Sequence, residues 1–370
     1  MPAAVECIDV STLRLAEYPK PAVAEDGVLL KVLRAGVCGT DLEGIKGRRN
    51  LRHPVIPGHE VVAVVEKIGS QAHRHIRVFD TPALREGDRV TINPRIVCGR
   101  CHNCQHLPGR QEMCLQPQTY GSSLGSGQPP YFLGGWAEHL YVLPGSELIK
   151  LPDGLSDDVA VLCEPFGVAA ALVDRFQSRH DWIAGDGFGL HRTVLVYGAG
   201  AIGILMAAAF ALAGAKQIIM VDVVGERLAL SESFGVTHTM NSAVAPVQPE
   251  AVKEMTEGLG ADIVVEACGV PQVIGEGIQL LRRGGTLFEV GHLANVGMAE
   301  IDPLIVCRNE LEILGHYAYP TSQSLAFAAR LLAAGDFPYE RLLHTIPLRE
   351  YAAILDDDFR KKTARIAFRM

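Results

Sequence analysis

Four cysteines stand close together in the polar stretch VCGRCHNCQHLPGRQEMC at residues 97–114. Their spacing is C-x2-C-x2-C-x9-C, and they are Cys98, Cys101, Cys104 and Cys114. One tetrahedral ion can gather four thiolates at this spacing, whereas the stretch is too polar to bury a group of unligated thiols. Because four thiolates leave no open coordination position, the spacing predicts a structural zinc site, not a catalytic one.

A second set of ligand-type residues is dispersed along the chain. It comprises Cys38 in GVCGTD, His59 and Glu60 in PGHE, and Glu164 in CEPFG. Sulfur, nitrogen and oxygen ligands with room for a water are typical of catalytic zinc. Each residue also has an ordinary explanation, as a buried thiol, a turn histidine, a loop charge or a helix-surface acid. Only the combination favours a catalytic metal site.

A glycine-rich turn follows the apolar run TVLVYG. The turn, Gly198-Ala199-Gly200-Ala201-Ile202-Gly203, matches G-x-G-x-x-G between a predicted strand and a predicted helix. Glycines there permit a tight turn and close approach of a pyrophosphate, to which the helix N-terminus offers free N–H donors. We therefore expect a dinucleotide to contact these residues: Gly198, Gly200, Ala201, Ile202, Gly203, Asp222 and Arg227.

Asp222 ends the next predicted strand, 19 residues beyond Gly203. A carboxylate at this position accepts hydrogen bonds from the adenosine ribose hydroxyls and repels a 2′-phosphate. The sequence thus predicts NAD as the cofactor in preference to NADP. His292 follows the predicted strand TLFEVG and fits either a place near the nicotinamide or an ordinary turn.

The elements that must position these residues fall into two patterns. From about 28 to 150, short apolar runs alternate with Gly, Pro and Asp turns, which predicts a β-rich, barrel-like region. From about 193 to 291, strand-like runs alternate with helix-length segments, which predicts a parallel, doubly wound sheet. Residues 155–176, with Ser156 or Asp157 as a cap, predict a helix, and residues 178–192 predict a loop. The tail predicts a helix at 324–335 and a final strand at 364–370.

Length and composition agree with two folded domains. The chain has 370 residues, of which 48% are hydrophobic and 21% charged. Its net charge is −8, and it has no basic run that would follow a phosphate backbone, so nucleic acid is not an expected partner. The apolar stretch 193–215 is long enough to be considered as a membrane span, but its three spaced glycines favour strand, turn and helix.

The N-terminal residues show neither a basic start nor an apolar core, so no secretory signal is expected. A cytoplasmic location follows as the prediction. Nine cysteines in a reducing compartment are better interpreted as metal ligands and small buried residues than as disulfides.

Taken together, these motifs resemble the zinc-dependent medium-chain dehydrogenase/reductase family over nearly the whole chain. The motifs are GVCGTD, PGHE, GDRV, the four cysteines, GGWAEHLYV, EPFGVA and VLVYGAGAIG with VD after it. The resemblance implies a mixed α/β fold with a GroES-like, zinc-containing catalytic domain at residues 1–165 and 318–370. It implies a Rossmann domain at residues 166–317, with the active site in the cleft between the two domains. Relatives are commonly dimers or tetramers.

Within the family, CEPFG resembles the polyol, threonine and glucose dehydrogenase branch. By that match Cys38, His59 and either Glu60 or Glu164 hold the catalytic zinc. Thr40 matches the hydroxyl that contacts the substrate oxygen. Glu43 stands where many relatives have a histidine, which puts the outer end of a proton relay in doubt. The x9 spacing before Cys114 is two residues longer than the usual x7.

The resemblance implies two zinc ions per chain and hydride transfer between an alcohol and NAD, with a sugar, polyol or hydroxy acid as the expected substrate class. Alternatives are a reductase of simple alcohols or aldehydes, a zinc-free reductase and a non-catalytic zinc-ribbon binding module. A further alternative is a catalytically silent zinc- and NAD-binding redox sensor. Turnover on adding alcohols, and its loss with a strong chelator, discriminates the enzyme from the zinc-ribbon binding module.

Overall fold

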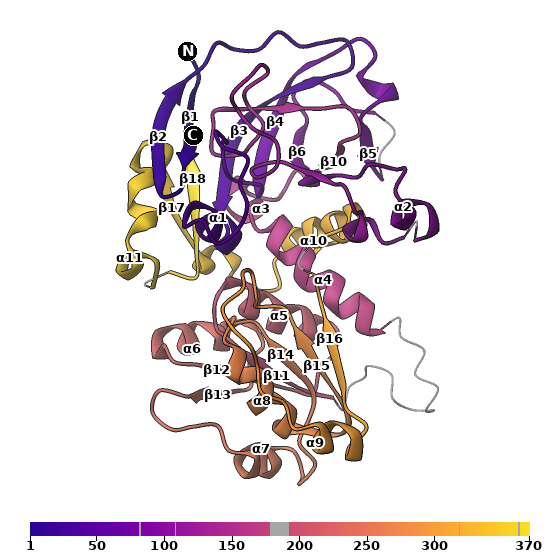
Figure 1. Ribbon diagram of the computed structural model, residues 1–370, viewed down its shortest axis with the longest axis vertical. Helices are drawn as coiled ribbons and strands as arrows, with labels where there is room; N and C mark the ends of the chain where they lie inside the picture. The colour runs from indigo at the N-terminus through magenta and orange to yellow at the C-terminus, as the bar shows by residue number, and fades with distance from the viewer. Residues whose placement is uncertain (81–82, 108, 178–191, 318, 362) are drawn as a thin grey trace. The chain divides into compact units, whose positions relative to one another are not determined.

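The computed structural model describes residues 1–80, 83–107, 109–177, 192–317, 319–361 and 363–370. The chain forms two compact units, of which the first is Met1–Gly167 with Tyr319–Met370 and the second is Val168–Ala318. Both termini belong to the first unit (Figure 1). The loop predicted at 178–192 lies, except for Arg192, outside the described residues.

An eight-stranded, mostly antiparallel sheet organises the first unit, as the turn-rich sequence at 28–150 predicts. Its path runs β17 (Leu343–Pro347), β18 (Arg365–Arg369), β3 (Val28–Val37), β4 (Val61–Ile68), β6 (Arg89–Ile92), β10 (Glu147–Lys150) and β5 (Arg77–Phe79), and β9 (His139–Val142) also pairs with β3. The register between β3 and β4 shifts twice, and such bulges bend a sheet. The C-terminal strand β18 pairs antiparallel with β3, so the predicted final strand becomes part of this sheet.

The β-rich unit encloses a core of Val, Ile and Leu side chains around the fully buried Trp136. Short paired strands flank the sheet: β1 (Ala3–Asp9) with β2 (Thr12–Glu17), and β7 (Arg95–Ile96) with β8 (Gln118–Thr119). Its α-helices are α1 (Gly39–Ile45), α2 (His102–His106), α3 (Asp157–Ala160), the start of α4 (Cys163–Gln177), α10 (Ser322–Ala334) and α11 (Asp357–Lys361). The 3₁₀ turns are η1 (Ala72–Arg74), η2 (Gln111–Met113), η4 (Tyr339–Leu342) and η5 (Leu348–Leu355).

Helix boundaries follow local capping chemistry. Ser156 caps α3 by accepting a bond from Val159 N–H, and Thr321 caps α10 by accepting one from Ser324 N–H. Gly335 ends α10 in the left-handed conformation that glycine favours. The predicted helix at 155–176 is divided into α3 and α4 by two intervening residues.

A six-stranded parallel sheet organises the second unit. Its order is β13 (His238–Asn241), β12 (Gln217–Asp222), β11 (Thr193–Tyr197), β14 (Ala261–Glu266), β15 (Leu281–Glu289) and β16 (Glu312–Gly315). The helices between these strands are α5 (Ala201–Leu212), α6 (Gly225–Ser231), α7 (Pro249–Met255), α8 (Pro271–Leu280) and α9 (Pro303–Arg308), with the 3₁₀ turn η3 (Glu232–Phe234). This is the doubly wound order of dinucleotide-binding sheets, so the predicted α/β class is confirmed.

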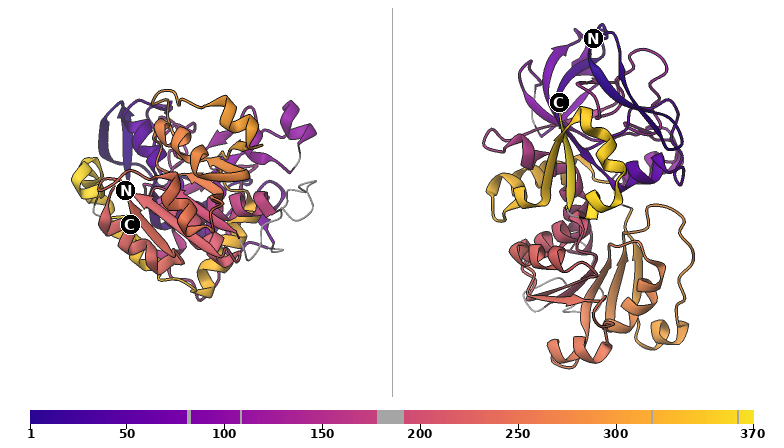
Figure 2. Two further views of the ribbon diagram at one scale, coloured as in Figure 1. Left: turned by 90° about the horizontal axis from the view of Figure 1, so that it is seen from below. Right: turned by 90° about the vertical axis from the view of Figure 1, so that its left-hand side faces the viewer.

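The direction of the chain reverses between β11 and β14. From β11 it moves outward through β12 to β13, and from β14 it moves the other way through β15 to β16. Right-handed crossovers therefore place α5 and α6 on one face of the sheet and α8 on the other, and Figure 2 shows helices on both sides. Ligands of such sheets bind outside the carboxyl ends of the strands at this reversal.

The apolar stretch 193–215 forms β11 and α5, not one continuous helix. Within the described ranges, no helix combines the length and the apolar character needed to cross a membrane.

Candidate metal and dinucleotide sites

Cys38 and His59 are brought together by two turns in the first unit. Cys38 follows β3 and precedes α1, while His59 lies in the PGHE turn that leads into β4. Gly58 in that turn has φ +90° and lies so close to Trp136 that a Cβ would fall 2.2 Å from the indole ring. Only glycine meets both demands. One donor atom each from Cys38, His59 and Glu60 lie within 4.8 Å of one another.

Asp41 orients this pair, and the sequence reasoning missed it. Its side chain, 3% exposed, accepts bonds from Cys38 N–H at 2.9 Å and Gly58 N–H at 3.3 Å. It also lies 3.2 Å from His59 Nδ1. A carboxylate bonded to one imidazole nitrogen leaves the other nitrogen for a metal and fixes the ring. The signal was present in GVCGTD, where Asp41 stands three residues after Cys38 and so can bond back to the helix start.

The electrostatics of the pair favour a cation. Burial alone raises the pKa of Cys38, but the hydrogen bond from His59 and the charge of Arg365 lower that pKa to about 6. Burial disfavours protonated His59, yet the charge of Asp41 and its hydrogen bond raise the His59 pKa well above the ordinary value. A thiolate beside an imidazole is the donor chemistry that zinc binds, with the ion taking the place of the imidazole proton.

Glu60 is fully buried and is engaged by a cation from the C-terminal strand. Arg365 on β18, itself 7% exposed, donates from Nε to Glu60 Oε2 at 3.0 Å and also contacts the other carboxylate oxygen. Gly36 leaves the space for this carboxylate, since a Cβ there would lie 1.9 Å from Glu60 Oε2. Arg365 is 305 positions away in the sequence, so no local pattern pointed to it.

Glu164 approaches the pair from α4. The side chain is 5% exposed, and burial raises the pKa of its carboxyl to about 8. The charge of His59 opposes this rise, while Cys38 and Asp41 add to it. Glu164 therefore lies within electrostatic reach of both Cys38 and His59, although it is outside the group of three donors within 4.8 Å.

The two other predicted catalytic residues lie on α1. Thr40 is half-buried in the first turn, two residues after Cys38. Glu43, farther along the helix, forms ion pairs with Arg48 at 3.2 Å and Lys46 at 3.8 Å. The structure thus places Thr40 next to the Cys38 turn and engages Glu43 with surface cations.

The cysteine lobe, Cys98–Cys114, gathers its four thiols without a disulfide. Sγ of Cys98 lies 3.7 Å from Sγ of Cys114 and 4.0 Å from that of Cys104. Four sulfurs at about 2.3 Å from one tetrahedral zinc would be about 3.8 Å apart. The residues present therefore fit a Cys₄ zinc.

Backbone N–H groups of the lobe also point at its sulfurs. Cys101 N–H donates to Cys98 Sγ at 3.3 Å, and Cys104 N–H and Leu115 N–H each donate to Cys101 Sγ at 3.4 Å. Hydrogen bonds from Leu115 and Cys104 lower the pKa of Cys101 to about 6. Such bonds favour the thiolate, the form that binds metal.

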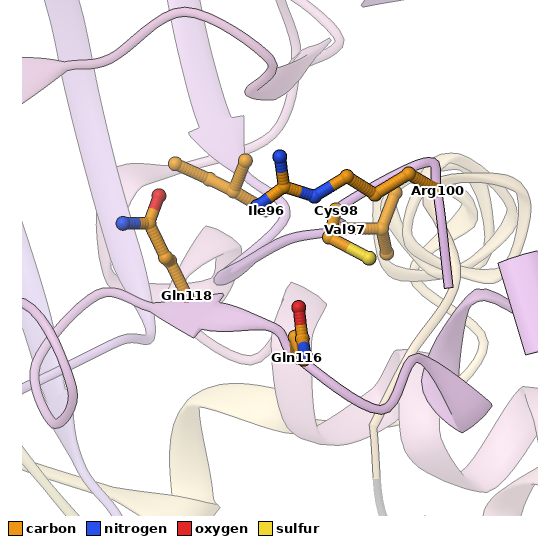
Figure 3. A pocket seen from close by; sticks show the side chains of 6 residues that line it. All are labelled: Ile96, Val97, Cys98, Arg100, Gln116 and Gln118. Atoms are coloured by element: carbon orange, nitrogen blue, oxygen red, sulfur yellow. The ribbon is translucent and has the colours of Figure 1, made fainter.

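A pocket of about 260 Å³ lies beside the cysteine lobe. Figure 3 shows its polar lining, with the Cys98 sulfur and Arg100 guanidinium on one chain segment and the Gln116 and Gln118 amides on another. Ile96 and Val97 complete the wall. The pocket borders one predicted zinc ligand, Cys98, and its lining includes none of the residues around His59.

In the second unit, the glycine turn links β11 to α5 at the carboxyl edge of the sheet. Gly198 has φ +101° and packs on Ala267 and Cys268, while a Cβ at Gly203 would lie 1.8 Å from Gly198 O. A Cβ at Gly200 would meet nothing within 4 Å. Gly200 starts α5 without a side-chain cap, and Ala201 and Ile202 form its first turn. The uncapped N–H groups and the open space fit a pyrophosphate.

Asp222 contacts this turn, whereas Arg227 is placed only on the helix that follows Asp222 in the chain. Asp222 ends β12 and accepts bonds from Ala199 N–H at 2.6 Å and Val224 N–H at 2.8 Å. Its carboxylate therefore lies directly against the glycine turn, with lone pairs left for a further donor. Arg227 lies on α6, which follows β12. Together with the glycines, Asp222 forms a site that fits a dinucleotide.

Comparison with known proteins gives two family matches and full-length relatives. Residues 24–153 match the alcohol dehydrogenase GroES-like domain, and residues 201–334 match the zinc-binding dehydrogenase family. A probable D-xylulose reductase A from Emericella nidulans is 31% identical over 344 residues, covering 90% of this chain and 86% of that protein. An L-threonine 3-dehydrogenase from Coxiella burnetii is 28% identical over 358 residues, covering 96% and 95%.

Solved structures agree over the whole chain. A putative zinc-binding dehydrogenase from Sinorhizobium meliloti, bound to NADP, is similar with a TM-score of 0.84 at 27% identity, covering 100% of this chain and 99% of that one. An alcohol dehydrogenase from Thermotoga maritima has a TM-score of 0.88 at 23% identity, with the same coverage, and supports the fold.

Proposed function

The chain belongs to the zinc-dependent medium-chain dehydrogenase/reductase family, and we propose that it transfers hydride between a polar secondary alcohol and NAD. Family membership makes it an oxidoreductase acting on CH–OH groups, with zinc and a nicotinamide cofactor. The observation that carries the proposal is the group of Cys38, His59 and Glu60 with Glu164 in reach, because it offers mixed ligands and not a closed set of thiolates. The relatives named for a sugar ketone and a hydroxy amino acid support a polar substrate.

Each residue has one task in this proposal. Cys38 and His59 would hold a zinc ion, which would supply the Lewis acidity that lowers the pKa of an alcohol hydroxyl. Asp41 fixes the His59 ring and Arg365 holds Glu60. Thr40 accepts the hydroxyl proton and passes it outward. The glycine turn and Asp222 would position NAD, the proposed hydride acceptor.

We assign direct metal binding to Glu164 in preference to Glu60. Arg365 contacts both oxygens of Glu60, so that carboxylate already has a buried cation as its partner. The raised pKa of Glu164, about 8, marks a buried carboxyl that a divalent cation would stabilise in its charged form. A second, structural zinc is proposed in the cysteine lobe, giving two zinc ions per chain.

The proposal also covers the domains of the chain, its location and its assembly. The proposed catalytic domain comprises residues 1–165 and 318–370, and the proposed cofactor domain comprises residues 166–317. A cytoplasmic location keeps the thiolates reduced. The expected small-molecule partners are the alcohol and its ketone. A homodimer or homotetramer is proposed because β16 is the edge strand of its sheet among the described residues, and an edge strand can pair with a second chain.

A substrate panel tests the proposal. Polyols, sugars, hydroxy acids and phosphorylated alcohols are added to purified protein with NAD, and NADH absorbance is followed. We expect turnover with at least one polar secondary alcohol and its loss after a strong chelator. Cofactor binding with two zinc ions but no turnover on any class would instead support the redox-sensor alternative. Preference for ethanol or simple aldehydes would contradict the substrate class.

A further inference from the structure

Glu266, Glu289 and His292 form a second polar cluster, at the carboxyl edge of the parallel sheet. Glu266 ends β14 and Glu289 ends β15, and the two are paired in register on adjacent strands. Their side chains therefore leave the sheet on the same face at the same level. His292 follows β15 by three residues, and its Nδ1 lies 2.8 Å from Glu289 Oε1 and 3.3 Å from Glu266 Oε2.

The cluster is built into the loops next to the glycine turn. Glu266 is fully buried and accepts bonds from Cys268 N–H at 2.8 Å, Gly269 N–H at 2.6 Å and Gly291 N–H at 3.2 Å. Cys268 in turn packs on Gly198, the first glycine of the turn. The cluster is thus continuous, through these backbone contacts, with the dinucleotide site.

Two carboxyl groups share one imidazole in this cluster. A protonated imidazole adds at most one positive charge, so the cluster carries a net negative charge whenever both carboxyls are ionised. Burial and the charge of Glu266 raise the pKa of Glu289, while bonds from His292 lower it. Oε2 of Glu289 is buried and has no hydrogen-bond partner among the described residues. Like charges in register on neighbouring strands are unfavourable unless a partner compensates them.

A metal ion is a less suitable partner than a cationic ligand. The three side chains have donor atoms within 4.8 Å of one another, a spacing that would also suit a metal ion. Glu266, however, already accepts three backbone N–H bonds, and a proton on His292 Nδ1 would lie within reach of both carboxylates.

The strand order indicates which part of a bound dinucleotide would face the cluster. In this fold each half of the sheet binds one mononucleotide, and the acid after the second strand takes the adenosine ribose. Asp222 on β12 therefore marks the adenosine half, so the nicotinamide half of a bound dinucleotide is expected over β14 and β15. The nicotinamide ring carries a positive charge in NAD⁺ and none in NADH.

We propose that the Glu266–Glu289–His292 cluster places negative charge beside the nicotinamide and so strengthens binding of the oxidised cofactor relative to the reduced one. The inference rests on the proposed dinucleotide site and adds a determinant of cofactor redox preference. If the ring and one ionised carboxyl are separated by about 10 Å at an effective dielectric constant near 20, that charge would change the affinity ratio by about tenfold.

The test compares dissociation constants for NAD⁺, NADH and ADP-ribose by calorimetry in wild type and two variants. Glu289→Gln removes a charge but retains the acceptor for His292, and His292→Lys adds a permanent cation to a partly exposed position. Both are expected to raise the ratio Kd(NAD⁺)/Kd(NADH) by about tenfold. ADP-ribose, which lacks the nicotinamide, is expected to bind unchanged.

Glu254→Gln provides the matched control. Glu254 is an exposed carboxyl near the end of α7, which leads to the amino edge of β14, away from the cluster. Its variant is expected to leave the ratio at the wild-type value. Unchanged ratios in both cluster variants, with ADP-ribose bound normally, overturn the inference. Failure of wild-type protein to bind ADP-ribose overturns the proposed dinucleotide site itself.

Discussion

Glu60 and Glu164 are two buried carboxyls near one cysteine and one histidine, but the protein compensates them differently. Glu60 has Arg365 against its oxygens, whereas burial raises the Glu164 pKa to about 8. A carboxylate paired with a buried guanidinium mainly stabilises the fold, and one without such a cation is free to bind a metal. The two roles separate experimentally.

Glu164→Gln is expected to remove a metal ligand while leaving the fold intact. We expect one zinc ion to be lost per chain and kcat/KM to fall by about 100-fold or more. Glu60→Gln, the matched variant, leaves Arg365 buried without its charge partner and should lower the free energy of unfolding by about 3 kcal/mol. Metal analysis, steady-state kinetics and urea unfolding provide the measurements. A fully active Glu164→Gln enzyme would identify Glu60 as the ligand.

Asp222 combines a charge with two backbone hydrogen bonds, and its variants distinguish these contributions. Asp222→Asn keeps an acceptor for Ala199 N–H but loses the charge that repels a 2′-phosphate. We expect the preference for NAD over NADP, measured as a ratio of kcat/KM values, to fall about tenfold in Asp222→Asn. Asp222→Ala should in addition loosen the turn and weaken both cofactors. Unchanged selectivity in both variants would refute the assignment.

At the scale of elements, the βα turn assigns different duties to its glycines. A Cβ at Gly203 collides with Gly198 O, whereas Gly200 has φ −75° and open space around it. Gly203 therefore permits the helix to pack, and Gly200 permits a ligand to approach.

Gly203→Ala is expected to lower the free energy of unfolding by about 2 kcal/mol, because the helix must move away from the turn. Gly200→Ala should cost less than about 1 kcal/mol, yet weaken NADH binding by about tenfold or more, because its methyl group occupies the space of the pyrophosphate. Thermal unfolding and NADH fluorescence titration measure the two effects. Equal loss of stability in both variants would show that the turn has a structural role only.

At the amino ends of the strands in the same sheet, Asp262 makes ion pairs and a backbone hydrogen bond. Asp262 on β14 bonds Arg192 at 2.7 Å, Arg282 on β15 at 2.5 Å and Thr193 N–H on β11 at 2.7 Å. Burial alone raises the pKa of Asp262, but these bonds lower it overall below its usual value. One carboxylate thus joins three adjacent strands at their amino ends.

Because its folded pKa is depressed, Asp262 contributes stability that is present above the unfolded pKa of about 3.9 and lost as pH falls through the lower folded value. Asp262→Asn should therefore lower the free energy of unfolding by about 3 kcal/mol at pH 7, where a buried pair is broken. The difference in the free energy of unfolding between Asp262→Asn and wild type should become smaller towards pH 3. Urea unfolding at pH 7 and pH 3 measures it. A difference independent of pH would contradict the ionic role.

At the scale of the whole molecule, β16 is an edge strand that carries an exposed apolar side chain. It is the last strand of its sheet, and Ile313 on it is 38% exposed. Met298, which precedes α9, is 94% exposed, and Leu304 on α9 is 65% exposed. Among the described residues no strand pairs with the outer side of β16, and an unpaired edge strand favours pairing between chains.

Ile313→Lys is expected to convert the proposed oligomer to a smaller species, because lysine on an edge strand opposes pairing. Light scattering after size exclusion should give a multiple of 39.9 kDa for wild type and a lower multiple for the variant. Glu254→Gln, a remote exposed variant, should leave the mass unchanged. A wild-type protein of one chain mass would contradict oligomerisation.

Much of the architecture was readable from local pattern. Alternating strand and helix signals at 193–291 predicted the parallel sheet because buried parallel strands must be almost uniformly apolar and joined by helices. The family motifs marked the residues that approach one another around His59, and the short C-x2-C steps marked the cysteine lobe. These signals are local because tight turns and neighbouring ligands depend on residues a few positions apart.

The sequence by itself determined the fold class, the chemistry of the donor groups and the glycine turn. Only the tertiary structure decided that Arg365 engages Glu60, that Asp41 holds His59, and that Glu266 and Glu289 meet in register around His292. The physical reason is that such pairs depend on which strands become neighbours and with what register, and burial then sets their charge. Neither the pairing of strands nor the burial of a side chain can be derived from the spacing of residues along one segment.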